Sequence, residues 1–146
     1  MGEKYITYEH KVYPRFEDTD AYGIIHHSRY LTYIEEAKIA FLSDKNMFDS
    51  DVIDEKGGKF PVLDLYIKYI KAVHYKSKEP ILIKLKFIAV ENIKIKFEFK
   101  LFYENQKIVV GEMTHVYIDS NDKLRFDIPE KIKSRYEIML NEKIET

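Results

Sequence analysis

The sequence predicts an α+β domain, in which one long helix packs against a mostly antiparallel sheet of about five strands. Residues 28–42 repeat their apolar side chains at helical spacing, whereas several later segments alternate apolar and polar residues as half-buried strands do. Short turns between those later segments indicate antiparallel neighbours. The chain has 146 residues, no distinct linker and no internal repeat, so we expect a single domain over residues 1–146.

The long helix is expected to run from Ser28 to Leu42, with Ser28 as its N-cap. Its apolar stripe consists of Tyr30, Ile34, Ala37 and Phe41, widened by Tyr33 and Ala40. The helix should end near residues 43–46, because short polar side chains there compete for the backbone. Residues 47–60 contain a Gly-Gly pair and are predicted to form a loop that could include a short helical turn.

Five segments are expected to form strands: residues 6–16, 60–75, 81–90, 92–103 and 107–118. The clearest is residues 92–103, where isoleucine, phenylalanine and leucine alternate with lysine and glutamate. Hairpin turns are expected at residues 90–92 and 104–107. A terminal helix should begin with Pro129 at its first position and present an apolar face of Ile132, Tyr136, Met139 and Leu140. The order is therefore strand, long helix, four strands, terminal helix.

Composition excludes several functional classes. Lys and Arg number 24 against 25 Asp and Glu, a formal net charge of −1, so the whole chain offers no strong attraction to nucleic acid or an anionic membrane. The absence of cysteine excludes disulfides, thiolate metal sites and a thiol nucleophile. We expect a cytoplasmic protein without membrane insertion, because no signal-peptide core and no run of about 18–20 apolar residues is present.

Residues 15–30, RFEDTDAYGIIHHSRY, concentrate acids, a glycine and two histidines. Asp18, Asp20 and Gly23 imitate positions one, three and six of a calcium loop. The imitation fails at Tyr22 and Arg29, which stand where ligands five and twelve are required. The adjacent histidines lack the spacing of a zinc site, and no glycine pair brackets a serine as in a nucleophile elbow. We therefore expect no metal.

A carboxylate placed just before a helix remains. The start of a helix carries unpaired N–H groups and a partial positive charge, which suit it to stabilising a developing oxyanion. Asp20, with Gly23 permitting a tight turn behind it, could act there as base or nucleophile. The residues alone leave open an ordinary turn aspartate that accepts a backbone hydrogen bond.

The pattern R-x-x-D-T-D-x-x-G-I-I-x-H-x-x-Y-x-x-Y-x-E in residues 15–35 resembles the signature of the 4-hydroxybenzoyl-CoA thioesterase family. It is most similar to the bacterial branch of acyl-CoA thioesterases associated with the Tol-Pal system. The later strands and the Ile-Pro pair before the last helix agree with that family's layout over nearly the whole chain. The resemblance implies a hotdog fold, in which a curved antiparallel sheet wraps one long helix and subunits pair edge to edge as dimers or tetramers.

The resemblance also implies hydrolysis of an acyl-CoA thioester to a carboxylic acid and CoA, without metal or organic cofactor. By position, the family's catalytic aspartate falls on Asp20 rather than Asp18, which we interpret as a loop-shaping residue. The branch histidine falls on His27, a nearby backbone N–H would polarise the carbonyl, and Gly23 shapes the turn. Whether Asp20 attacks the carbonyl or activates water stays open.

Substrate-binding residues are expected at Tyr30, Glu35, Lys76 and Lys78. Tyr30 also belongs to the apolar stripe and Glu35 could simply be solvated, while the two lysines lie in a turn-like segment suited to CoA phosphates. Tyr22 and Lys38 depart from the family, which usually has a small residue and an arginine there. The alternatives are a non-catalytic acyl-CoA-binding module, an acyl-carrier-protein thioesterase, and an enoyl-thioester hydratase or dehydratase.

Overall fold

The computed structural model describes residues 5–45, 59–76, 78–90, 94–125 and 130–145. The strands are β1 (Ile6–Val12), β2 (Val62–Tyr69), β3 (Ile81–Val90), β4 (Lys94–Tyr103), β5 (Gln106–Ile118) and the short β6 (Leu124–Arg125). The helices are α1 (His27–Asp44) and α2 (Glu130–Glu145), and a single 3-10 turn covers Phe16–Asp18. This order confirms the predicted succession of one strand, a long helix, four strands and a terminal helix.

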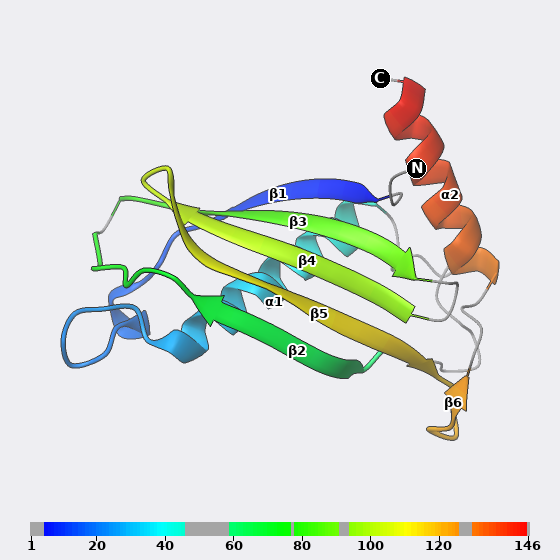
Figure 1. The fold of residues 1–146 in the computed structure, drawn as a ribbon, viewed down its shortest axis with the longest axis horizontal. Helices are drawn as coiled ribbons and strands as arrows, with labels where there is room; N and C mark the ends of the chain where they lie inside the picture. The colour runs from blue at the N-terminus through cyan, green and yellow to red at the C-terminus, as the bar shows by residue number, and fades with distance from the viewer. Residues whose placement is uncertain (1–4, 46–58, 77, 91–93, 126–129, 146) are drawn as a thin grey trace.

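The strands form one antiparallel sheet in the order β1-β3-β4-β5-β2, with β6 paired to the end of β5. Figure 1 shows this sheet curving across α1, which lies along one of its faces, while α2 stands at the end where β3 finishes. The opposite face of the sheet is not covered by α1. The α+β class and the single long helix are therefore as predicted.

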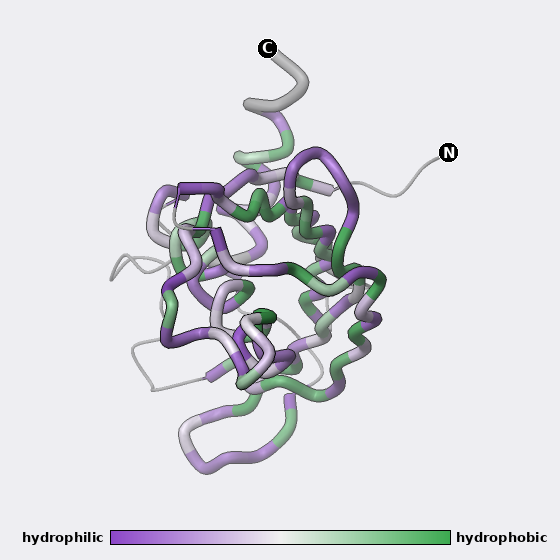
Figure 2. Tube along the Cα trace, turned by 90° about the vertical axis from the view of Figure 1, so that its left-hand side faces the viewer, coloured by the Kyte–Doolittle hydropathy of each residue, from purple (hydrophilic) through white to green (hydrophobic). Residues whose placement is uncertain are grey.

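The core lies between α1 and the inner face of the sheet. Along β4 the buried residues are Ile95, Phe97, Phe99, Leu101 and Tyr103, every second position, as the alternating pattern predicts. The ring of Phe41 on α1 lies 5.2 Å from that of Phe87 and 6.0 Å from that of Phe97, centroid to centroid. In Figure 2 short hydrophobic and hydrophilic stretches alternate along the trace, which is the same pattern in three dimensions.

Close packing between β5 and β2 depends on Gly111. A Cβ atom at this position would lie 2.1 Å from the Tyr66 carbonyl oxygen and 2.6 Å from the ring of Phe99. Both distances are far below van der Waals contact, so only glycine lets β2 approach and lets the Phe99 ring lie across β5. Gly111 thus holds the last strand of the sheet in place.

Two element boundaries differ from the sequence prediction at the helix start and in β1. The N-cap of α1 is His26 rather than Ser28, because the His26 ring nitrogen Nδ1 accepts a hydrogen bond from the Ser28 N–H at 3.2 Å. A ring nitrogen at this position does what a serine hydroxyl usually does. The first strand ends at Val12 instead of residue 16, since the 3-10 turn at Phe16–Asp18 redirects the chain toward the helix.

Two later strands were also predicted with different bounds. The predicted strand 60–75 is a strand only over β2, with a register shift between Val62 and Asp64. The N–H groups of Ile70 and Lys71 both donate to the Ile108 carbonyl and end the ladder. β5 begins one residue earlier than predicted. Its hairpin turn needs only Glu104 and Asn105, whose positive φ angles of 50° and 65° are those of a two-residue turn.

Several expectations fall on residues outside the described ranges. These are most of the predicted loop 47–60, most of the turn 90–92 and Pro129. The face predicted for the terminal helix is confirmed in part, since Met139 is buried and the Tyr136 ring lies 5.4 Å from that of Phe87. Among the helices that the structure describes, none has the length and apolar content needed to span a bilayer.

Candidate active site

A tight loop carries Asp20 to the start of α1. Thr19 and Ile25 form an antiparallel bridge, and the Asp20 N–H donates to the Ile24 carbonyl at 2.8 Å. Gly23 closes the turn with its N–H on the Asp20 carbonyl at 3.1 Å, at a φ of +76° that favours glycine. The loop is therefore a small hairpin with fixed ends, and Gly23 has the turn role predicted for it.

The carboxylate of Asp20 is held by one of its two oxygens. Oδ1 accepts hydrogen bonds from the N–H groups of Tyr22 at 2.8 Å and Ile24 at 3.2 Å, which is an Asx-type turn. For Oδ2 there is no hydrogen-bond partner among the described residues, and the side chain is half-buried. The turn thus fixes the direction of the carboxylate while one oxygen stays open to another group.

Asp18 has a different environment and is buried under the loop. Its Oδ2 accepts the Arg15 N–H at 3.0 Å and the Tyr33 hydroxyl at 2.7 Å, and its Oδ1 lies 3.5 Å from the Arg29 guanidinium. Burial, together with this carboxylate, raises the pKa of Tyr33 well above its usual range, so the phenol stays a hydrogen-bond donor. These contacts give Asp18 the scaffolding role inferred from the sequence.

The first turn of α1 presents an open donor. The Ser28 N–H is taken by the His26 ring and the Arg29 N–H donates to the His26 carbonyl at 2.9 Å. The His27 N–H has no acceptor among the residues that the structure describes. Because the helix dipole adds partial positive charge at this end, this N–H is suited to an anion or a polarised carbonyl.

Aromatic side chains surround this donor. The His27 ring stacks on His26 at 4.3 Å between centroids and meets Tyr69 of β2 edge-on at 6.1 Å. The Tyr69 hydroxyl donates to the His27 carbonyl at 3.3 Å, and its ring lies 5.8 Å from that of Tyr30. Burial raises the pKa of Tyr30 to about 12. Tyr30 is thus a core residue that supports the wall of the site, whereas the His27 side chain is exposed.

Glu35 lies two turns further along α1 and is joined to a buried cation. Its carboxylate, about half exposed, accepts a hydrogen bond from Lys38 Nζ at 2.8 Å. Lys38 is buried against the Met113 sulfur at 3.0 Å and lies 5.5 Å above the Phe97 ring. Burial lowers the pKa of Lys38, although the Glu35 carboxylate opposes that shift. Glu35 is therefore part of an ion pair rather than a simply solvated acid.

Sequence reasoning missed His115, which is buried near Lys38. Its Nδ1 lies 2.8 Å from the Phe60 carbonyl, and Nε2 has no partner among the described residues. Burial lowers the pKa of His115, and the Lys38 charge lowers it further. His115 sits in a regular strand pattern where a buried polar residue gives no signal in the sequence.

The two lysines predicted to contact CoA phosphates lie on the segment behind the loop. The Tyr75 N–H donates to the Gly23 carbonyl at 3.1 Å and the Ile25 N–H to the Val73 carbonyl at 2.9 Å, so this segment is fixed against the Asp20 loop. Lys76 is exposed and its Nζ lies 2.6 Å from Glu104, which raises the pKa of Lys76. Lys78 is exposed as well.

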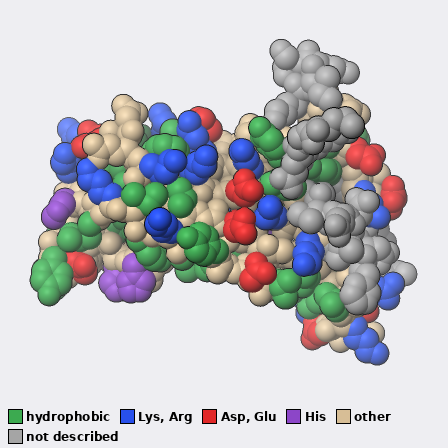
Figure 3. All heavy atoms as spheres, in the orientation of Figure 1, with side chains coloured by type: hydrophobic (Ala, Val, Ile, Leu, Met, Phe, Trp, Pro, Cys, Tyr) green, Lys and Arg blue, Asp and Glu red, His purple; other side chains and the backbone are tan. Residues whose placement is uncertain are grey.

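Large side chains near the loop are exposed to solvent. Phe16 is 75% and Tyr22 83% accessible, and Tyr69 is 44% accessible. Figure 3 shows histidine and hydrophobic side chains together at the end of the molecule where the loop lies in Figure 1. Clusters of exposed aromatic side chains commonly mark binding or protein-protein surfaces.

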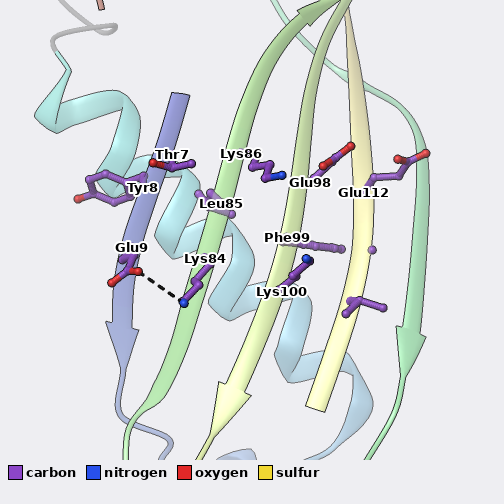
Figure 4. A pocket seen from close by; sticks show the side chains of 12 residues that line it. Thr7, Tyr8, Glu9, Lys84, Leu85, Lys86, Glu98, Phe99, Lys100 and Glu112 are labelled. Carbon is purple, nitrogen blue, oxygen red and sulfur yellow. Dashed lines mark ion pairs between the residues drawn. The ribbon is translucent and has the colours of Figure 1, made fainter. Parts of the chain in front are cut away.

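The outer face of the sheet carries a separate hollow of about 560 Å³ that contains none of the predicted site residues. Figure 4 shows its lysine and glutamate side chains standing in front of the strands, with α1 behind them. Lys84 forms an ion pair with Glu9 at 3.8 Å. Such alternating charges are typical of the wet face of a sheet, so this hollow is not the candidate active site.

Two relatives of known sequence resemble this chain to different extents. The acyl-CoA thioesterase YbgC of Haemophilus influenzae is 25% identical over 121 residues, covering 83% of this chain and 88% of that protein. The protein YneP of Bacillus subtilis is 38% identical over 61 residues, which cover 42% of this chain and only 44% of that protein.

A solved structure shares the fold over most of the chain. The 1,4-dihydroxy-2-naphthoyl-CoA thioesterase of Synechocystis superposes with a TM-score of 0.77 at 16% identity, over 89% of this chain and 95% of that one. This likeness confirms the expected hotdog architecture of one long helix and a curved antiparallel sheet. Residues 14–136 match the family described as the Thioesterase-like superfamily, and the chain therefore belongs to that superfamily.

Proposed function

We propose that the protein hydrolyses an acyl-CoA thioester to a free carboxylic acid and CoA. The observation that carries this proposal is the His27 N–H at the start of α1, which has no acceptor among the described residues. A hydrogen-bonded hairpin connects it to Asp20, whose carboxylate is bonded through Oδ1 only. Hydrolysis of a thioester needs a hydrogen-bond donor for the carbonyl oxygen and a base or nucleophile for attack on the carbonyl carbon. The name of the YbgC relative supports acyl-CoA as the substrate class. Membership of the bacterial Tol-Pal-associated branch rests on the pattern in residues 15–35 alone.

The chemistry requires no metal or organic cofactor. The thioester carbonyl oxygen would accept a hydrogen bond from the His27 N–H, and its carbon would then be attacked. In one route Asp20 takes a proton from water as the water oxygen attacks; in the other the carboxylate attacks and water later cleaves the anhydride. Either route breaks the carbon–sulfur bond, and the thiolate of CoA leaves and takes up a proton. The exposed His27 side chain, next to the His27 N–H, would assist the reaction from the solvent side of the site.

We also propose that the protein acts as a homo-oligomer, a dimer or a tetramer. β2 is an edge strand, and its Leu65, which lies opposite the buried Met113 of β5, is 40% accessible. An open strand edge with exposed apolar side chains favours pairing with another strand, and a two-fold axis would pair β2 with itself. A second copy would then lie against β2, the strand whose Tyr69 hydroxyl bonds the His27 carbonyl at the start of α1. A cytoplasmic location stays a prediction of the sequence alone.

The test is an Asp20→Asn variant assayed by thiol release on a panel of acyl-CoA thioesters. The amide oxygen of asparagine can still accept the two backbone hydrogen bonds, so the loop should keep its shape. Loss of the base or nucleophile should lower kcat by at least about 100-fold. Glu17→Gln, an exposed acid on the same segment, is the matched control and should retain wild-type turnover. Wild-type turnover by Asp20→Asn would refute the assignment.

The second candidate is a module that binds an acyl-CoA without cleaving it. It is favoured by the same two hydrogen bonds to Asp20 Oδ1, which is what a purely structural turn aspartate would make. Tight binding of a non-hydrolysable acyl-CoA thioether, with no thiol released by the wild-type protein from any thioester, would establish this alternative. Parallel assays on acyl carrier protein thioesters separate the two carriers.

A further inference from the structure

A small cavity of about 140 Å³ lies behind the Asp20 loop. Its walls are residues 71–74 and Lys76 on one side and the ends of β4 and β5 on the other. In Figure 1 the chain between β2 and β3 passes beside the β4–β5 hairpin at this end of the molecule. A hydrogen bond connects the cavity wall to the Asp20 loop. The Ile25 N–H donates to the carbonyl of Val73, and Val73 lines the cavity.

One polar group in this cavity wall has no partner. Tyr103, which is only 8% accessible, carries a buried hydroxyl with no hydrogen-bond partner among the described residues. A buried hydroxyl is costly unless it is hydrogen-bonded, and none of the residues that the structure describes accepts its proton. Tyr103 therefore brings an unused donor to the wall of the cavity, where it is buried.

Two ammonium groups lie at the same cavity. Lys71 Nζ donates to Gln106 Oε1, and Lys76 Nζ lies 2.6 Å from Glu104 Oε1. An ammonium has three N–H donors, so each lysine keeps donors beyond the one used in this contact. Among the lining residues these two cations face only one carboxylate, that of Glu104. Glu79 also acts electrostatically on Lys76, so it is the surplus of N–H donors that suits a compact anion with several acceptor oxygens.

We propose that this cavity binds a phosphate group of coenzyme A, through the Tyr103 hydroxyl and the Lys71 and Lys76 ammonium groups. The proposal rests on the proposed function for its source of phosphate. It extends the expectation for Lys76 by adding two residues that the sequence did not single out. Bound phosphate would hold residues 71–76 against the Asp20 loop. This would orient the thioester of the bound acyl-CoA.

The experiment uses full-length wild type, Tyr103→Phe and Lys71→Ala, with Lys107→Ala as the control. Lys107 is an exposed lysine on the same hairpin and does not line the cavity. Binding of CoA and of inorganic phosphate is measured by titration calorimetry. Turnover is compared on an acyl-CoA and on the N-acetylcysteamine thioester of the same acid, which has no phosphate. Thermal unfolding verifies that each variant is folded.

Both cavity variants should bind CoA roughly tenfold more weakly and show a KM for acyl-CoA raised by a similar factor, the loss expected for one strong hydrogen bond. Their kcat/KM on the N-acetylcysteamine thioester and all values for Lys107→Ala should stay at the wild-type level. Unchanged CoA binding in both variants, or an equal loss on both thioesters, would overturn the proposal. Variants that lose only inorganic phosphate would show a site for free phosphate, which also overturns it.

The same experiment distinguishes a failure of the proposed hydrolysis from a failure of the proposed phosphate site. If the wild-type protein releases no thiol from either thioester but the two variants still weaken CoA binding, the cavity assignment stands and hydrolysis does not. If a Tyr103→Phe protein is too unstable to test, Lys71→Ala decides alone, because its side chain is exposed.

Discussion

The ion pair between Lys38 and Glu35 should respond with opposite signs to removal of its two partners. The Lys38 side chain is only 5% accessible, whereas that of Glu35 is 48% accessible. The carboxylate therefore remains largely hydrated, while the ammonium has lost its water and has one carboxylate oxygen and a thioether sulfur in exchange. The desolvation cost falls almost wholly on the lysine.

Lys38→Met replaces the buried cation by an unbranched apolar side chain that can pack against Met113 and Phe97. We expect the free energy of unfolding to rise by about 1 kcal/mol, at the low end of what replacement of buried charges gives, because the free Glu35 can rehydrate. Glu35→Gln leaves the buried ammonium without its anion and should lower the free energy of unfolding by about 1–3 kcal/mol.

Urea unfolding at pH 7 and one fixed protein concentration measures both variants, since oligomers unfold in a concentration-dependent way. The midpoint of thermal unfolding should move up for one variant and down for the other, by roughly 2–4 °C per kcal/mol. Because burial lowers the pKa of Lys38, the folded protein loses this proton at a lower pH than the unfolded chain. The free energy of unfolding of wild type should therefore rise relative to that of Lys38→Met as the pH rises toward 10.5. Equal destabilisation by both variants would refute the reasoning.

Three further outcomes are expected. Gly111→Ala should lower the free energy of unfolding in urea by more than about 2 kcal/mol, because its Cβ would meet the Tyr66 carbonyl. Gly23→Ala has open space around its Cβ but is strained in φ, and should lower it by about 1 kcal/mol; equal losses would contradict this. The pKa of His115 is lowered by burial, so the unfolded chain takes up the proton first; stability should fall as the pH drops below about 6.5, and a His115→Gln variant should flatten that loss in a pH series of unfolding. Leu65→Lys on the exposed edge of β2 should reduce the oligomer to monomers in sedimentation, and an unchanged mass would argue against pairing through β2.

Local patterns were sufficient for the regular parts of the fold. β3 has the predicted ends, and β4 ends at Tyr103 as predicted, because an alternating sequence buries one face whatever surrounds it. Boundaries that depend on a competing contact were missed. His26 caps α1 through its ring, and β2 ends where two N–H groups share the Ile108 carbonyl, which no short-range pattern indicates.

The sequence by itself determined the α+β class, the order of the elements and the acidic loop before the helix, since all three follow from local periodicity and turn chemistry. Only the tertiary structure separated the two aspartates of that loop physically, burying Asp18 against Tyr33 and leaving one oxygen of Asp20 open. It alone placed Tyr103 and Lys71, which are 32 positions apart, on the wall of one cavity, because β2 finishes next to the start of β5. Contacts between distant segments depend on sheet register, which a single sequence does not encode locally.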